Sequence, residues 1–153
     1  MRSHSKSSRP PISLENHVFI ALLQSADALT QEAEHLVKAA ALTGAQYNVL
    51  RILRGAEPEG LACKGIGDRM ISHDPDMTRL LDRMEKRGLI TRERQTDDRR
   101  VVKTRIAPQG LSLLKTLDQP IRDLHKRQFR HMSAARLKIL FDLLEEVRNR
   151  KAA

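Results

Sequence analysis

Residues 74–106 read DPDMTRLLDRMEKRGLITRERQTDDRRVVKTRI, and this stretch decides the fold. Its first half predicts a helix over 75–87, with Asp74 as the N-cap, Pro75 in the first turn and Gly88 as the residue that ends it. Its second half alternates polar and apolar side chains on either side of a polar turn. That pattern predicts a two-stranded hairpin of 90–94 and 101–106.

Both of these elements are basic. Residues 79–105 hold ten Lys and Arg against five Asp and Glu, and the 153-residue chain has a formal net charge of +9. Residues 12–40, by contrast, hold four acids and one lysine. A basic segment that follows an acidic helix along the sequence favours an anionic partner, most commonly a phosphate backbone. The alternative is a solvated basic face without a partner.

Three further helices are expected before this segment. Ser13 can cap an amphipathic helix whose apolar residues recur over 14–36. The sequence TGAQ at 43–46 has the form of a capping box and opens a second helix that closes at Gly55. After a turn, a short helix is expected near 62–71, although it contains two glycines.

The chain after the hairpin is again expected to be helical. A helix starts at Pro108, and Pro120 should kink or interrupt it before it continues to about Met132. Ser133 can cap a last helix with apolar residues over 137–147. The apolar stripes of the first and last helices find no partner within the chain, as in helices that pair with a second copy.

Helix, turn, helix, turn, basic helix and hairpin is the order of a winged helix-turn-helix, so the fold class is α+β and mostly α. The basic helix has the width of the major groove, and the hairpin can lie along the backbone and reach the minor groove. We expect the helix to contact DNA through Asp76, Met77, Thr78, Arg79 and Arg83. We expect backbone and minor-groove contacts from Arg94, Arg99, Arg100 and Lys103 in the hairpin, and from Lys64 ahead of the helix.

Three motifs resemble the multiple-antibiotic-resistance regulator (MarR) family: TRLLDRMEKRGLI at 78–90, DDRR at 97–100 and IAPQG at 106–110. The resemblance extends over roughly 13–150. It implies a homodimeric transcription regulator, since family members are mostly repressors and many release DNA when a small, often aromatic or phenolic, molecule binds. We expect the two copies to bind an inverted-repeat operator. The resemblance also places Thr78 and Arg79 in the recognition helix, Arg100 in the minor groove and Asp98 as the acid that orients Arg100.

The resemblance and the helical stripes together divide the chain. We expect a disordered tail over 1–12, an N-terminal dimerisation helix over 13–41, a winged-helix DNA-binding domain over 42–108 and C-terminal dimerisation helices over 109–153. The sequence departs from the family pattern at Ile106-Ala107, where Leu-Thr is usual, and at Gly65 and Gly67. These departures concern the geometry of the DNA complex and leave the fold unchanged.

Other classes of protein are disfavoured. No apolar run is long enough for a membrane span, and the start of the chain is not a secretory signal, so we expect a cytoplasmic protein without disulfides. We expect no enzymatic activity, cofactor or metal, because the chain has neither catalytic motifs nor metal-ligand spacings. Two alternatives stay open: a basic helical module that binds RNA or a protein, and a redox-responsive regulator acting through Cys63.

Overall fold

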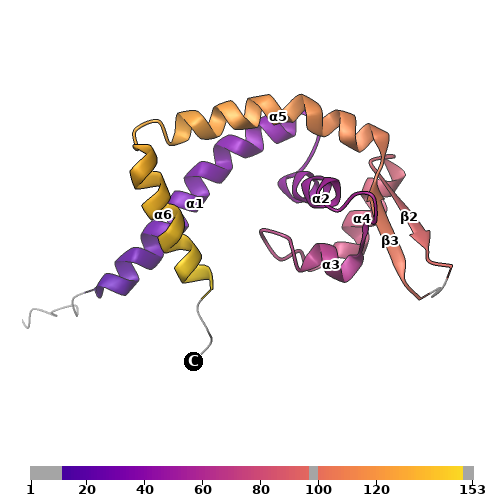
Figure 1. Cartoon of the computed structure of the whole chain (residues 1–153), viewed down its shortest axis with the longest axis horizontal. Helices are drawn as coiled ribbons and strands as arrows, with labels where there is room; N and C mark the ends of the chain where they lie inside the picture. Colours follow the sequence, from indigo (N-terminus) through magenta and orange to yellow (C-terminus); the bar gives the residue numbers. More distant parts are fainter. Residues whose placement is uncertain (1–11, 97–99, 150–153) are drawn as a thin grey trace, which may run out of the picture.

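The computed structural model describes residues 12–96 and 100–149 (Figure 1). Within them the elements run α1 (Leu14–Ala39), α2 (Gly44–Arg54), β1 (Leu61–Ala62), α3 (Cys63–Gly67), α4 (Met77–Lys86), β2 (Ile90–Arg94), β3 (Val102–Ile106), α5 (Pro108–Gln128) and α6 (Ala134–Arg148). Helix α5 (Pro108–Gln128) spans one side of the molecule. It joins a body formed by α2, α3, α4 and the strands to a second part formed by α1 (Leu14–Ala39) and α6 (Ala134–Arg148). The winged-helix fold with long terminal helices is confirmed.

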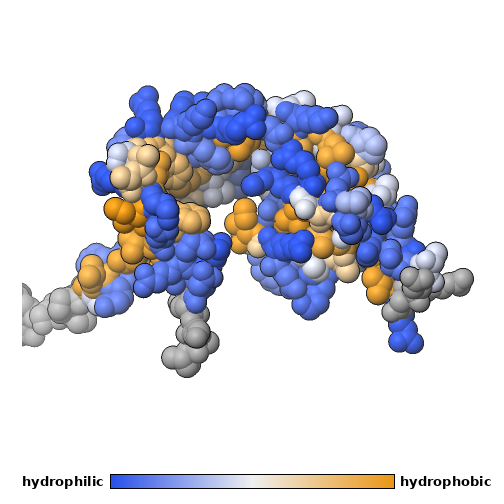
Figure 2. Space-filling view, viewed as in Figure 1, coloured by the Kyte–Doolittle hydropathy of each residue, from blue (hydrophilic) through white to orange (hydrophobic). Residues whose placement is uncertain are grey.

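The two terminal helices start where their caps predict. The Ser13 side chain accepts the Asn16 N–H at 3.2 Å, and the Ser133 side chain accepts the Arg136 N–H at 3.3 Å. Neither helix is covered by the rest of the chain, since α1 buries only Val37 and α6 buries no residue. Figure 2 shows apolar side chains gathered over both helices. The exposed set comprises Leu14, Val18, Phe19, Ile20, Leu23, Ile139, Phe141, Leu143, Leu144 and Val147.

Helix α2 (Gly44–Arg54) begins with the predicted capping box. Thr43 Oγ1 accepts the Gln46 N–H at 3.2 Å, and Gln46 Oε1 accepts the Thr43 N–H at 3.0 Å. The helix ends at Gly55 and a turn leads to Gly60, whose φ is +70°. A Cβ at Gly60 would lie 2.5 Å from the Thr104 carbonyl oxygen. Glycine is therefore required where this turn meets the sheet.

The helix expected near 62–71 is shorter than predicted. The segment forms a two-residue strand β1 (Leu61–Ala62) and then α3 (Cys63–Gly67). Strand β1 pairs with β3, Leu61 lying opposite Thr104. Two residues are too few to show alternation, so the sequence carries no signal for a strand whose partner lies some 40 residues away. The two glycines weaken the helix, which ends at the second of them.

Helix α4 (Met77–Lys86) ends in a Schellman motif. Gly88 has a φ of +70° and donates its N–H to the Glu85 carbonyl at 2.8 Å. The Leu89 N–H bonds the Met84 carbonyl at 3.0 Å. The chain turns here directly into the sheet, as the sequence predicted.

The hairpin is confirmed, with a slightly later return. Strand β2 (Ile90–Arg94) pairs antiparallel with β3 (Val102–Ile106), and the sheet order is β1-β3-β2. Val101, predicted to start the second strand, lies before it. Thr104 and Ile106 are buried and Val102 is half-buried on one face, as the alternation predicted.

The core lies between α2, α4, α5 and the inner face of the sheet. Nearly all of its fully buried side chains are apolar, and they include Val49, Leu50, Leu53, Ile66, Leu81, Met84, Leu89, Ile90 and Leu114; Thr104 is a polar residue that is fully buried too. The N-terminal turn of α5 approaches this core very closely at Gly110, where a Cβ would overlap the carbonyl oxygen of Leu89. The glycine of the 106–110 motif is therefore the point at which α5 contacts the turn between α4 and β2.

Helix α5 runs continuously through Pro120, so the expected interruption is wrong, whereas the expected kink stays a prediction. Pro120 and Thr116 are both exposed. The carbonyl four residues before the proline, which loses its N–H partner, therefore lies on the solvated side. The helix ends at Gln128 instead of near Met132, and the Gln128 side chain donates to the Leu29 carbonyl of α1 at 3.0 Å.

An ion pair fixes α5 to α2. Arg54 donates from Nη1 and Nη2 to the Asp118 carboxylate at 2.9–3.0 Å. The hydrogen bonds from Arg54 lower the pKa of Asp118 below its usual value, and the same bonds raise the pKa of Arg54. This bidentate contact links the body of the molecule to its long connecting helix.

In residues 12–96 and 100–149, no helix combines the length and the apolar character that crossing a bilayer requires.

Candidate nucleic-acid interface

Helix α4 starts two residues later than predicted, and its N-cap is Asp76 instead of Asp74. Asp76 Oδ1 accepts the Arg79 N–H at 3.2 Å, and the Arg79 side chain lies 3.4 Å from the same carboxylate. Asp74 instead accepts the Asp76 N–H at 2.8 Å. Either aspartate could cap a helix, and Asp76 does so because Asp74 forms the turn that precedes it.

The exposed side of α4 is basic. Thr78, Arg79 and Arg83 are exposed, and so are Lys86 and Arg87 at the end of the helix. No ion pair joins Arg83 or Lys86 to any other residue of the described ranges. Met77, predicted to face DNA, is half-buried and packs against the core.

The acids of α4 are held by one arginine of the hairpin. Arg92 Nε and Nη2 donate to Glu85 Oε2 at 2.9 and 2.7 Å, and Nη2 donates to Asp82 Oδ1 at 2.5 Å. The hydrogen bond to Glu85, with that to Asp82, raises the pKa of Arg92 against the opposing effect of burial. This role of Arg92 was not predicted from the sequence. Arg92 neutralises both carboxylates of α4, so the positive charge of the exposed face is not cancelled by them.

The register of the hairpin divides its cations between two faces. Arg94 is exposed on the same face as Arg92, because residues two apart in a strand share a face. Lys103 lies on the opposite face, across from Glu93. Arg100 is exposed at the end of the turn, whereas Asp98 and Arg99 lie outside the described residues. The structure thus brings Arg94, and not Lys103, to the side of the hairpin that faces α4.

Two more of the basic residues have partners within the protein. Arg105, which the sequence analysis did not single out, donates to Glu93 Oε2 at 3.0 Å and to the Pro58 carbonyl at 2.9 Å, and so joins the hairpin to the turn before β1. Lys64 pairs with Asp68 at 2.7 Å, both side chains being largely exposed. Cys63 is an exposed free thiol at the start of α3.

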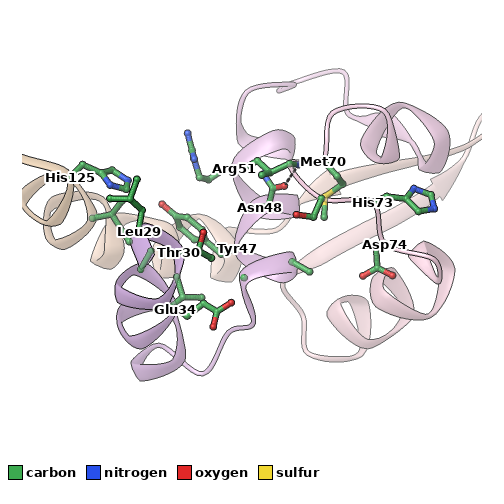
Figure 3. Close-up of a pocket in the computed structure, with 17 residues that line it drawn as sticks. Leu29, Thr30, Glu34, Tyr47, Asn48, Arg51, Met70, His73, Asp74 and His125 are labelled. Carbon is green, nitrogen blue, oxygen red and sulfur yellow. Dashed lines mark hydrogen bonds between the residues drawn. The ribbon is translucent and has the colours of Figure 1, made fainter. Parts of the chain in front are cut away.

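A cavity of about 400 Å³ lies between helix α2 and the long helices α1 and α5. Its walls come from α1, α2, α5 and the segment 70–74, which leads into α4. Figure 3 shows Tyr47 of α2 directed toward Leu29 and Thr30 of α1. The Arg51 guanidinium lies 5.8 Å from the centre of the Tyr47 ring, and burial raises the pKa of the Tyr47 hydroxyl.

None of the residues that line this cavity was predicted from the sequence to do so. Its polar members on α2, namely Tyr47, Asn48 and Arg51, stand at helical spacing and are indistinguishable in sequence from a solvated helix face. Only the packing of α1 and α5 over α2 encloses them. The available signal is the spacing of Tyr47 and Arg51, which places an arginine one turn after an aromatic ring on the same helix face.

Comparison with known proteins gives a consistent result. The MarR family model matches residues 42–102. The crystal structure of a MarR transcription factor from Planctomyces limnophilus is 39% identical, covers 89% of this chain and 98% of its own, and superposes with a TM-score of 0.67.

Two curated relatives are similar over most of the chain. The organic hydroperoxide resistance transcriptional regulator of Bacillus subtilis is 33% identical over 108 residues, 70% of this chain and 72% of that protein. The homoprotocatechuate degradative operon repressor of Escherichia coli is 28% identical over 133 residues, 87% of this chain and 88% of that protein. With a basic helix α4 beside a basic hairpin, the chain belongs to the MarR family of transcriptional regulators.

Proposed function

We propose that two copies of this chain bind an inverted repeat in double-stranded DNA and repress transcription until a small effector enters the cavity. The observation that carries the DNA-binding part is the charge arrangement at α4. Arg79, Arg83 and Lys86 are exposed on the helix, while its acids are paired with Arg92 on the side of the hairpin. Helix α4 would enter the major groove, and the hairpin would follow the backbone into the minor groove.

The dimer is supported by the uncovered apolar faces of α1 and α6. Side chains such as Phe19, Leu23 and Phe141 are each more than half exposed in the single chain. A contiguous apolar surface of this kind is unfavourable in water and is removed when a second copy covers it. The pair would present two α4 helices to half-sites about one helical turn apart. A regulator of this kind acts in the cytoplasm.

Selection of bound duplexes from a random pool tests the function directly. We expect a palindromic consensus, a complex with two protein chains per duplex, and an affinity that falls steeply with salt. Structured RNA of the same length is the control. Preferential binding to that RNA, or capture of duplexes without any common sequence, would contradict the assignment and favour a general basic module.

Arg100 of the hairpin is expected to contribute one backbone or minor-groove contact. Arg100→Ala should weaken binding to selected and random duplexes alike, by about tenfold, and lower the slope of log affinity against log salt by about one. Fluorescence anisotropy at several salt concentrations measures both quantities. Arg136→Ala on α6 removes the same charge at the other end of the molecule and should leave the slope unchanged. If the wild type, Arg100→Ala and Arg136→Ala all have the same slope, the hairpin is not part of the DNA interface.

The effector we propose is a small aromatic or phenolic acid. A cavity of about 400 Å³ accommodates one aromatic ring with short substituents, with apolar contacts from Leu29, Ala33 and Ile121. Arg51 forms no ion pair with another described residue and can receive a carboxylate. The ligand can release DNA only by binding the two conformations of the dimer with different affinity.

A panel of monohydroxylated benzoates and phenylacetates tests the effector class. We expect at least one to dissociate the protein from its selected duplex, and we expect Arg51→Met to raise the concentration required by about tenfold without changing DNA affinity in its absence. Phenol, which lacks the carboxylate, should be insensitive to the substitution. If no acid dissociates the complex at millimolar concentration, the proposed effector class is wrong, whereas the proposal that the protein binds DNA still stands.

A further inference from the structure

One wall of the cavity is continuous with the start of the recognition helix. Residues 70–74 line the cavity, and only Pro75 separates them from the N-cap Asp76 of α4. Figure 3 shows His73 and Asp74 on this segment, between the cavity and α4. A change in the position of this wall therefore changes the position of the first turn of α4.

Very little holds residues 71–75 in place. The Ile71 N–H donates to Asn48 Oδ1 at 2.8 Å, and in the ranges 12–96 and 100–149 this is the one hydrogen bond from 71–75 to another element. The Ile71 side chain is 81% exposed, so packing does not replace the bond. The link is drawn as the dashed line at Asn48 in Figure 3. The Asn48 amide, itself part of the cavity wall, is thus the anchor of this segment.

Local hydrogen bonds transmit the position of the segment to α4. Asp74 accepts the Asp76 N–H at 2.8 Å, which fixes the turn before the helix. Asp76 Oδ1 in turn accepts the Arg79 N–H at 3.2 Å, and the Asp76 carboxylate pairs with the Arg79 side chain at 3.4 Å. The side chain of Arg79 is therefore oriented by a series of contacts that begins at Asn48.

We propose that Asn48 is a positioning residue for DNA recognition, through which the cavity controls the first turn of α4. The proposal rests on the function proposed above. While the Asn48 amide oxygen accepts from Ile71, Asp76 and Arg79 are held for base contacts. A ligand that turns the amide toward itself withdraws the acceptor, releases residues 71–75 and disorders the cap. Asn48 itself touches no DNA.

Three variants test the proposal. Asn48→Ala removes the acceptor, Asn48→Asp keeps an oxygen in its place, and Gln119→Ala removes an exposed amide of α5 that lies outside the cavity. Two readouts are taken: hydrogen exchange of the Arg79 amide in the free protein by NMR, and the ratio of affinities for the selected duplex and a random duplex.

We expect Asn48→Ala to accelerate exchange of the Arg79 amide about tenfold and to lower the affinity ratio about tenfold. Affinity for random duplex and the salt slope should change less than twofold, because phosphate contacts are retained. Asn48→Asp and Gln119→Ala should resemble the wild type in both readouts. A merely structural loss would instead lower the melting temperature and weaken binding to both duplexes alike.

Unchanged Arg79 exchange in Asn48→Ala overturns the proposal, whatever the DNA result. Faster exchange of the Arg79 amide with an unchanged affinity ratio also overturns it, since the hydrogen bond at Asn48 would then have no effect on the choice of DNA sequence. Failure of Asn48→Asp to restore either readout shows that the acceptor is not what matters. A wild-type protein that binds no duplex selectively refutes the proposed function instead, and the exchange measurement still decides whether Asn48 positions α4.

Discussion

Replacing Gly110 with alanine is expected to destabilise the protein by about 3 kcal/mol, which corresponds to a melting temperature roughly 10 °C lower for a chain of this size. The added Cβ would overlap the Leu89 carbonyl oxygen and would lie 3.0 and 3.1 Å from Ile106 and Leu50. A backbone oxygen cannot move aside as a flexible side chain can. The same oxygen also accepts the Ala107 N–H at 3.0 Å, so a shift would break that bond. Thermal unfolding monitored by circular dichroism measures the effect.

Gly44→Ala is the matched control for this experiment. A Cβ at Gly44 meets no atom within 4 Å, and the residue lies in the first turn of α2. We expect this variant to be as stable as the wild type or slightly more stable, by about 0.5 kcal/mol, since alanine has less conformational freedom to lose. If both glycine variants unfold at the same temperature, the close approach of α5 to Leu89 is not a constraint on the fold.

Replacing Arg92 with leucine is expected to weaken duplex binding about thirtyfold at 0.1 M salt, although Arg92 is not directed at DNA. The change would leave Asp82 and Glu85 unpaired on α4, where each carboxylate would repel nearby phosphates by about 1 kcal/mol. It would also remove the hydrogen bonds that hold β2 against α4. Anisotropy titration with a selected duplex measures the loss.

The double variant Arg92→Leu with Glu85→Gln separates the two effects. If unpaired carboxylates cause the loss, replacing Glu85 with a neutral amide should recover several-fold in affinity, and more at low salt than at high salt. A double variant as weak as Arg92→Leu at every salt concentration would show that the position of the hairpin, and not the charge on α4, was responsible.

Local signals in the sequence were sufficient for most of the helices. Each of these helix ends is formed by the residue that the sequence indicates: Ser13, Thr43 with Gln46, and Ser133 at N-caps, and Gly88 after a C-terminus. Such caps depend on residues at most five positions apart, so they can be predicted from local sequence. Strand β1 was missed because it exists only through its pairing with β3. Pro120 does not interrupt α5, because solvent can satisfy the carbonyl that the proline leaves free.

The site was less predictable than the fold for a similar reason. Sequence shows where cations are, but not which of them are already paired. Arg54 and Asp118 are 64 residues apart, and Arg92 meets Glu85 and Asp82 only once the hairpin packs on α4. The cavity needs three helices and a loop in place before its residues face one another. Recognition-helix residues such as Arg79 and Arg83 could be proposed from one amphipathic pattern, whereas Asn48 and Arg51 could not.

Helix α5 is attached at three points along its length: at Gly110 to the turn after α4, at Asp118 to Arg54, and at Gln128 to Leu29 of α1. Its 21 residues make a rigid lever about 32 Å long. A rotation of about 5° at the end held by α1 moves the opposite end by about 3 Å, which is the length of one hydrogen bond to a base. In the proposed switch α5 itself would stay folded, and a few degrees of tilt at one end would be amplified along its length.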